Sequence, residues 1–362
     1  MEIKSKNKYA YIKVASTLRE KIISGRLAPG ELVCSEAEIC EQFGVSRGPV
    51  RQAMRSLVDE HYLTRVPGKG TFVRDIRQVR ALQVTVLVDL LPENYWNPFL
   101  QDIIQGLRLA AKQMNRPCNL SFVFQSFNET LDYDFLNSSS GDGIIFVPIN
   151  SQGVNFLNDL APGMLKCKAI SYYRKLENSR ISQLYMDHET GSFRMIKYLL
   201  GQGHRRMLLL METSLSTQID SQDRMKGCLR AYKETGVDAD SLYILKSGVF
   251  YESIAADLDR LLRTQKVEVL LVSGELLARN VLRFIESRKL KIPDDISIIF
   301  FDDCEDFKTY SPKLTAVRQV NSMGTHMALE QLLNELRNPS LDPIRISLKP
   351  ELVIRDSCKT FI

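Results

Sequence analysis

Histidine and tryptophan are scarce in this chain, which holds four histidines and one tryptophan among 362 residues. Its seven cysteines are scattered, and no two stand in the Cys-x-x-Cys spacing of a zinc or redox site. The sequence therefore shows no metal constellation, and we expect no bound metal. The odd number of cysteines, and a start without an apolar export signal, favour reduced thiols and a cytoplasmic protein.

Long apolar runs and cofactor motifs are also missing. No stretch of about 18 apolar residues occurs, so we expect no membrane span. There is no Gly-x-Gly-x-x-Gly after a strand, no Gly-x-x-x-x-Gly-Lys-Ser/Thr loop and no Gly-x-Ser-x-Gly elbow. We therefore expect no cofactor and no catalytic residues. The acidic pairs Asp302-Asp303 and Glu305-Asp306 could suggest carboxylate chemistry, but such acids more often cap a loop or bind a hydroxylated ligand.

Positive charge is concentrated at the N-terminus. Residues 1–80 hold 15 Lys and Arg against 9 Asp and Glu, whereas the remainder holds 33 against 34. A basic head on a neutral body suggests a polyanion partner for the head, although a solvated surface would carry the same charge. The length predicts two or three domains.

The head begins with two predicted helices. Residues 9–24 place apolar side chains on one helical face, and Gly25 follows at a position that ends helices. Ser35 and Glu38 form a capping box that opens a second helix, which Gly44 ends.

A third helix follows after a tight turn. Ser46 is a good N-cap, and Pro49 stands in the first turn, where its missing N–H costs nothing. Arg47, Arg51 and Arg55 are four apart and share one edge, so they could reach phosphates or guanine in a major groove. The predicted buried face is formed by Val50, Ala53, Met54, Leu57 and Val58.

A short hairpin completes the head. Residues 63–66 and 71–73 are predicted as strands, and residues 67–70 turn between them. Lys69 at the tip is placed for the phosphate backbone or the minor groove, although a hairpin lysine can also serve solubility alone. Helix, turn, helix and basic hairpin together are typical of a DNA-binding winged helix.

The head resembles the GntR-type winged helix-turn-helix. Its motifs run in order from Ile12 to Val73 as Leu27-x-Pro29-Gly30-Glu31, Ser35-Glu36-x-Glu38-Ile39, Phe43-Gly44-Val45-Ser46-Arg47 and Gly68-x-Gly70-Thr71-Phe72-Val73. The resemblance implies operator contacts by Ser46, Arg47 and Arg51. Ala37 stands where the family often has a further contacting arginine. The full set of expected DNA-binding residues is Ser35, Ser46, Arg47, Gly48, Arg51, Lys69, Gly70 and Thr71.

Strands and helices alternate through the body. The predicted strands are residues 82–89, 119–125, 143–148, 169–173, 206–211, 267–273 and 296–301, and the predicted helices are 99–114, 191–200, 223–235, 277–288 and 325–336. Such alternation predicts an α/β fold with parallel sheets covered by helices on both faces. The length favours two doubly wound sheets with a ligand cleft between them. We expect a head at 1–76, a linker at 77–82 and a two-lobed domain at 83–362.

The body resembles the periplasmic-binding-protein-like effector domain of LacI-type regulators. The motifs that carry this resemblance are Asn97-Pro98-Phe99, Gly143–Pro148, Met186-Asp187-His188-x-x-Gly191, Leu199-Leu200-x-x-Gly203-His204-Arg205, Arg224-x-x-Gly227, Ile292-Pro293-Asp294-Asp295-Ile296-Ser297, Asp302-Asp303, Pro312-x-Leu314-Thr315 and Pro350-Glu351-Leu352-Val353-x-Arg355-Asp356-Ser357. Joined to a GntR-type head, the body makes the chain similar to arabinose-repressor-like regulators. The family's cleft takes a sugar or sometimes a nucleoside. The implied effector-binding residues are Trp96, Phe99, Asn150, Tyr173, Arg174, Arg224, Glu275 and Asp302.

These implied residues have structural alternatives, and the chain departs from the family. Phe99 could stack on a sugar or fill the core; Arg224 could grip ring oxygens or form a surface ion pair; Trp96 could line the cleft or pack in its loop. Gly274-Glu275 replaces the usual Asn-Asp pair, Phe300 replaces a glycine, and Tyr173 replaces an aspartate. The departures favour a pocket of different shape, with Tyr172 as a further aromatic candidate.

The sequence thus predicts a homodimeric transcription regulator, most plainly a repressor, that binds double-stranded operator DNA and a small-molecule effector. Two alternatives belong to other classes. One is a cytoplasmic solute-binding or sensor protein without a genetic role. The other is a doubly wound enzyme with a DNA-tethering head, against which the missing nucleophile, metal and phosphate motifs argue.

Overall fold

The computed structural model describes residues 2–75, 81–89, 98–114, 117–127, 133–139, 141–161, 163–212, 218–248 and 250–361. The chain divides into two compact units: Met1–Gln83 with Ala111–Asn119, and Val84–Ala110 with Leu120–Ile362. Residues 77–80 of the expected linker lie outside the described residues, as does Trp96.

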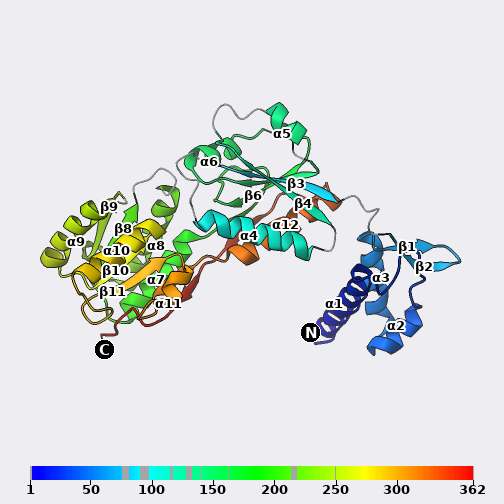
Figure 1. Ribbon diagram of the computed structural model, residues 1–362, viewed down its shortest axis with the longest axis horizontal. Coiled ribbons are helices and arrows are strands. Elements are labelled where there is room, and N and C mark those ends of the chain that lie inside the picture. The colour runs from blue at the N-terminus through cyan, green and yellow to red at the C-terminus, as the bar shows by residue number, and fades with distance from the viewer. Residues whose placement is uncertain are drawn as a thin grey trace. The chain divides into compact units, whose positions relative to one another are not determined.

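The head contains three helices and a two-stranded antiparallel hairpin (Figure 1). Its elements are α1 (Glu2–Ile23), α2 (Glu36–Phe43), α3 (Arg47–Asp59), β1 (Leu63–Val66) and β2 (Gly70–Val73). The predicted capping box is present, because Ser35 Oγ accepts from Glu38 N and Glu38 Oε2 accepts from Ser35 N. Gly44 ends α2 with a φ of 62°, a left-handed conformation that suits glycine.

One apolar core holds the head together. Val50 and Leu57 of α3 are fully buried and pack with side chains of α1, α2 and the hairpin. Of the face predicted for α3, only Val58 is half-buried at the edge of this core. The core members are Val14, Ala15, Leu18, Ile22, Val33, Ile39, Val50, Ala53, Met54, Leu57, Tyr62, Leu63 and Val73.

The described residues of the body form two six-stranded sheets, and we call the parts built on them the first and second lobes. The first sheet has the order β13-β7-β6-β5-β3-β4, with β13 to β3 parallel between neighbours. Its strands are β3 (Leu82–Val88), β4 (Cys118–Phe124), β5 (Gly143–Val147), β6 (Lys168–Tyr173), β7 (Ser182–Met186) and β13 (Arg345–Leu348). Its helices are α4 (Pro98–Gln113), α5 (Tyr133–Ser139), α6 (Ser151–Asn158) and α12 (Asn321–Arg337).

The second sheet has the order β14-β12-β11-β10-β8-β9. Its strands are β8 (Met207–Glu212), β9 (Leu242–Ser247), β10 (Val269–Ser273), β11 (Ser297–Phe301), β12 (Thr315–Arg318) and β14 (Glu351–Val353). The pairs are parallel except that β14 runs antiparallel to β12. Its helices are α7 (His188–Gly201), α8 (Gln218–Thr235), α9 (Tyr251–Gln265), α10 (Glu275–Ser287) and α11 (Glu305–Thr309), with a 3-10 turn at Ala239–Ser241.

Alternating side chains of the second sheet build two cores. Leu208 and Leu210 pack on the side of α9 and α10, whereas Leu209 and Met211 pack on the side of α7 and α8. Because helices cover both faces of this sheet, the side chains on both faces of each strand are buried. These strands are therefore continuous apolar runs in the sequence. The predicted α/β fold with two doubly wound sheets is confirmed.

The lobes are joined by neighbouring crossovers. The chain passes from the first sheet to the second after β7, returns after β12 and passes over again after β13. Gly191 lies where these segments meet, because a Cβ there would be 3.1 Å from Pro350 and 3.2 Å from Val317. None of the helices in the described part of the chain combines the length and apolarity needed to span a bilayer.

Candidate functional site

The opening turn of α3 presents a basic, unobstructed surface. Ser46, Arg47 and Gly48 are exposed, and Ser46 stands at the N-cap position without making a side-chain cap bond. A Cβ built on Gly48 would meet nothing within 4 Å, so the surface beside this glycine is open. Arg51, one turn further on, is also exposed.

Arg51 is held by a carboxylate of the preceding helix. Its Nε donates to Glu36 Oε2 at 2.8 Å, while 66% of the arginine side chain stays exposed. The pairing raises the pKa of Arg51, and its main cause is this hydrogen bond. An exposed ion pair of this kind adds little stability, but it restricts the directions in which the guanidinium can point.

The hairpin carries the remaining predicted DNA-binding residues. Lys69 and Gly70 are exposed at its tip and Thr71 is half-buried. The tip is formed by left-handed glycines, Gly68 with a φ of 74° and Gly70 with a φ of 116°. Ser35 is exposed, but its hydroxyl already accepts the Glu38 amide, so its role in the structure is helix capping.

A polar cluster joins the two lobes of the body. Arg224 and Asp220 come from α8 of the second lobe, and Tyr173 and Arg174 come from the carboxyl end of β6 in the first. Parallel α/β sheets bind ligands beyond the carboxyl ends of their strands, which is where these residues gather. Tyr173 has a φ of 98° and Asp302, just after β11, a φ of 83°, and strained backbone of this kind clusters at functional sites.

Arg224 lies at the second-lobe side of the cluster and is 5% exposed. Its Nη1 donates to Ser273 Oγ at 2.5 Å, and its Nη2 lies 3.5 Å from Asp302 Oδ2. The guanidinium also stacks over Phe301, 4.9 Å from the ring centroid. Gln319 Nε2 donates to the other oxygen of Asp302. These contacts make Arg224 a buried ion pair rather than the surface pair that its sequence also allowed.

Arg174 lies at the first-lobe side and is 3% exposed. Its Nε and Nη2 both donate to the Ile149 carbonyl, at 3.1 and 2.6 Å, and its Nη1 pairs with Asp220. The Tyr173 hydroxyl donates to the other Asp220 oxygen at 3.1 Å. The Asp220 carboxylate therefore bridges from α8 to two neighbouring residues of the first lobe.

His188 completes the surroundings of Asp220. Its Nε2 lies 3.3 Å from Asp220 Oδ1, and its ring packs edge-on against Tyr173 with centroids 5.8 Å apart. Burial, together with the neighbouring positive charges of Arg224 and Arg174, holds the pKa of His188 well below its usual range. The histidine is therefore neutral at pH 7, and burial also raises the pKa of Tyr173.

Asn150 serves the first-lobe loop instead of pointing an oxygen at the cleft. Its Oδ1 accepts from Gly153 N at 3.0 Å and so caps α6. Asp89, fully buried after β3, accepts from the amides of Phe127, Ile149 and Asn150. Burial raises the pKa of Asp89 in spite of these bonds.

Three predicted effector residues fall partly or wholly outside what the structure describes. Trp96 precedes the first described residue of α4. Phe99 and Glu275 lie in the first turns of α4 and α10, and their side chains are outside the described part of the chain. Gly274, which replaces the family's asparagine, is the N-cap of α10 with a φ of 113°.

Phe300 does not reshape the cleft as its sequence position suggested. It is fully buried on the α9 and α10 side of the sheet, where it stacks on Phe307 with ring centroids 4.3 Å apart. The neighbouring residue, Phe301, points to the opposite face and meets Arg224. Alternation along β11 therefore places the substituted glycine in the core.

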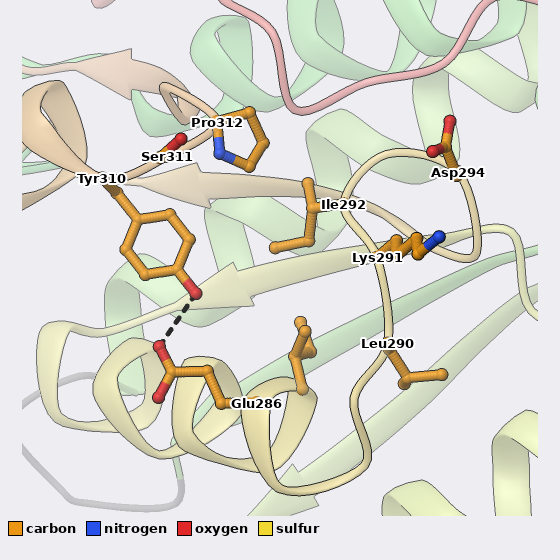
Figure 2. A pocket seen from close by; sticks show the side chains of 9 residues that line it. Glu286, Leu290, Lys291, Ile292, Asp294, Tyr310, Ser311 and Pro312 are labelled. Atoms are coloured by element: carbon orange, nitrogen blue, oxygen red, sulfur yellow. Dashed lines mark hydrogen bonds between the residues drawn. The ribbon is translucent and has the colours of Figure 1, made fainter.

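A cavity of about 310 Å³ lies elsewhere in the second lobe (Figure 2). It is lined by the end of α10 and by the loops that lead into β11 and β12, with Tyr310 donating to Glu286 Oε1 at 3.0 Å. These loops stand at the amino ends of the strands, opposite the edge that carries Ser273 and Asp302. The cavity contains none of the predicted effector residues, so we place the candidate ligand site at the polar cluster.

Comparisons with known proteins agree with this geometry. Residues 10–73 match the family described as bacterial regulatory proteins, gntR family, and residues 196–358 match the periplasmic binding protein-like domain. The chain joins a gntR-family head to a periplasmic-binding-protein-like body. The gntR-family match contains every predicted DNA-binding residue, and the body match contains Arg224 and Asp302.

Similar proteins with both parts or with the body alone are transcriptional regulators rather than enzymes. An arabinose metabolism transcriptional repressor of Geobacillus stearothermophilus is 26% identical over 99% of this chain and 100% of its own. Catabolite control protein A of Priestia megaterium is 24% identical over 77% of this chain and 83% of its own. A LacI family regulator of Enterococcus faecium, solved with ribose, has a TM-score of 0.62 and 19% identity over 77% of this chain and its full length.

Sequence reasoning missed several members of the cluster in this periplasmic-binding-protein-like body. Asp220 and His188 were not predicted, nor were Ser273 and Gln319, the partners of Arg224 and Asp302. One signal could have found Asp220: it stands four residues before Arg224 on the same helix, so the two share a helical face. No local signal points to Gln319, because only the fold brings it to Asp302.

Proposed function

We propose that this protein is a transcriptional repressor whose affinity for operator DNA is controlled by a small sugar-like effector bound between the lobes of its body. One observation carries the proposal: the chain combines an exposed, basic start of α3 with a buried polar cluster drawn from both lobes. A DNA-binding head alone would not need the second feature, and a solute-binding protein would not need the first.

On the head, α3 enters the major groove with Ser46, Arg47 and Arg51, and the backbone at Gly48 follows a phosphate. Arginine can bind guanine O6 and N7 with two hydrogen bonds, which makes Arg51 the residue to read a base. Lys69 and the glycine-rich tip of the hairpin contact the adjacent backbone, with Gly70 and Thr71 beside it. A gntR-type regulator of this kind acts in the cytoplasm, where it reaches DNA.

In the body, Arg224, Asp302, Arg174 and Tyr173 form the effector site. Carboxylates and guanidinium groups make the charge-assisted hydrogen bonds that fix polyhydroxylated ligands. The relatives named for arabinose metabolism and the regulator solved with ribose support a sugar. Because the cluster is formed by both lobes, a ligand there prefers one lobe arrangement over another.

The coupling needs two heads that move together. We expect a homodimer whose heads bind half-sites about one helical turn apart, as two-fold symmetric regulators do. An effector changes operator affinity only as far as it binds one lobe arrangement better than the other, and the change is reciprocal.

Electrophoretic mobility shifts with duplexes from the flanks of the gene test this proposal. We expect a specific complex at moderate salt that a sugar from a panel of pentoses, hexoses and disaccharides dissociates. Sedimentation of the complex gives its stoichiometry. Absence of any specific complex would refute the proposal that the protein regulates transcription. A complex whose stability does not change with any sugar that the body binds would refute the coupling between effector and operator binding.

A further inference from the structure

We propose that Asp220 makes the interlobe site selective for an uncharged polyhydroxylated ligand over its carboxylate or phosphate counterpart. The inference rests on the proposed effector site and narrows the chemistry of what it takes. The Asp220 carboxylate lies at the centre of the cluster, and no sequence motif predicted it as a site residue.

Charge is already balanced among the buried members of the site. Arg174 pairs with Asp220, and Arg224 pairs with Asp302. His188 is kept neutral by burial and by these arginines. An anionic ligand would therefore bring an unpaired negative charge next to two carboxylates, buried Asp220 and half-buried Asp302, and unpaired charge is strongly disfavoured where it is buried.

Arg174 in particular has three of its five N–H donors directed at protein acceptors. Two of them serve the Ile149 carbonyl and a third pairs with Asp220, and the side chain is 3% exposed. A carboxylate or phosphate at this guanidinium would compete with Asp220, the carboxylate already paired with it.

The unused hydrogen-bonding capacity of the site suits neutral hydroxyl groups. Among the described residues, Arg224 Nε finds no acceptor, and Gln319 Oε1 and Ser221 Oγ find no partner, although all three atoms are buried. Native proteins leave few buried polar atoms unpaired. A ligand with several hydroxyls can accept from Arg224 and donate to Gln319, and it can donate to Asp302, whose side chain is 34% exposed.

Matched neutral and acidic sugars test the selectivity on the full chain. Isothermal titration would compare D-galactose with D-galacturonate, D-glucose with D-glucuronate and glucose 6-phosphate, and L-arabinose with L-arabinonate. We expect at least one neutral sugar to bind, and its acidic counterpart to bind at least tenfold more weakly. An acidic member that binds as tightly as its neutral counterpart, or a panel in which no neutral sugar binds, would overturn the proposal.

Variants separate Asp220 from general effects. Asp220→Asn leaves Arg174 without its counter-charge, so the neutral-to-acid affinity ratio should fall at least tenfold. Glu234→Gln, which removes a charge from the exposed far end of the same helix, should leave the ratio unchanged. Asp220→Ser serves as a second variant if the asparagine impairs folding. A folded Asp220 variant that binds with the wild-type ratio would contradict the proposal.

Operator binding by the same preparations keeps the two proposals apart. If the operator complex responds to an acidic sugar, the selectivity proposal fails while the regulator stands. If no operator is bound but the neutral-to-acid ratio is found as expected, the regulator fails while the selectivity of the site stands.

Discussion

Arg51 of α3 and Glu36 of α2 form a hydrogen-bonded ion pair on the exposed side of the head, with Nε 2.8 Å from Oε2. The base-reading arginine of the proposed interface is thus oriented before it meets DNA. In the unbound head, this pair restricts where the guanidinium points, while Glu36 also places a negative charge close to the expected phosphates.

Replacing Glu36 by glutamine should reduce the preference for operator over random DNA more than it reduces operator affinity itself. The variant loses a repulsive charge near the phosphates, so binding to random duplex should strengthen, and a freer Arg51 should lower the operator-to-random ratio severalfold. Fluorescence anisotropy with both duplexes at one salt concentration measures this ratio. Glu41→Gln, an exposed charge on the same helix, is the control; an equal effect there would show that net charge alone is responsible.

Arg51→Ala should cost about 1–3 kcal/mol of operator affinity if the side chain reads a base. The loss should be larger for operator than for random duplex, because a phosphate contact would weaken both alike. Effector binding by the body should stay at the wild-type level. Titration of operator and of the responding sugar gives both values, and a parallel loss of the two would point to misfolding instead.

Arg224→Ala should weaken effector binding and leave operator binding intact, which is the reverse of the effect expected for Arg51→Ala. It removes the partner of Asp302 and Ser273, so effector affinity should fall at least tenfold while operator binding persists. Calorimetric titration checks the first and mobility shift the second. Lys226→Ala, an exposed lysine on the same helix, is the matched control. Unchanged effector affinity in the arginine variant would remove Arg224 from the site.

His188 should make stability depend on pH. Its pKa lies below the ordinary value of 6.5 in the folded protein, because burial disfavours the charged ring. Below about pH 6.5 the unfolded chain binds a proton at this histidine that the folded chain does not bind. The contribution of His188 to the free energy of unfolding is therefore complete above about pH 6.5 and falls by up to about 1.4 kcal/mol per pH unit below it. Urea unfolding between pH 7.5 and 5.5 should show a smaller fall for His188→Gln; identical slopes would contradict this assignment.

Two glycines of the second lobe should respond to alanine in opposite ways. A Cβ at Gly227 of α8 would lie 2.1 Å from the Glu189 carbonyl oxygen, so Gly227→Ala must push α8 from α7 and should destabilise by roughly 1–3 kcal/mol. A Cβ at Gly201 meets nothing within 4 Å, so Gly201→Ala should be neutral or stabilise by up to about 1 kcal/mol. Thermal unfolding of both variants provides the comparison.

The sequence predicted most helices and strands because their signals are local. The capping box at Ser35, the glycine at Gly44 and the apolar face of α3 each depend on neighbours a few residues away. The missed elements are the strands β7, β9, β12, β13 and β14 and the helices α5, α6, α9 and α11. The antiparallel pairing of β14 with β12 could not be predicted from the apolar pattern of the sequence, because it depends on which sheet the edge strand joins.

The candidate site was only partly predictable. The resemblance supplied Arg224, Arg174 and Asp302, which the fold brings into one cluster. It also suggested that Phe300 shapes the cleft, and there the alternation of β11 sends the side chain into the core instead.

By itself the sequence determined that the chain has a basic winged-helix head and a two-lobed α/β body, since periodicity, caps and turn residues act over short distances. Only the tertiary structure decided that Asp220 bridges the lobes and that Gln319 meets Asp302. Asp220 lies 46 residues from its partner Arg174, across the crossover between the lobes, and Gln319 lies 17 residues from Asp302. Burial sets the pairing and the charge of these side chains, and burial is a property of the packed chain.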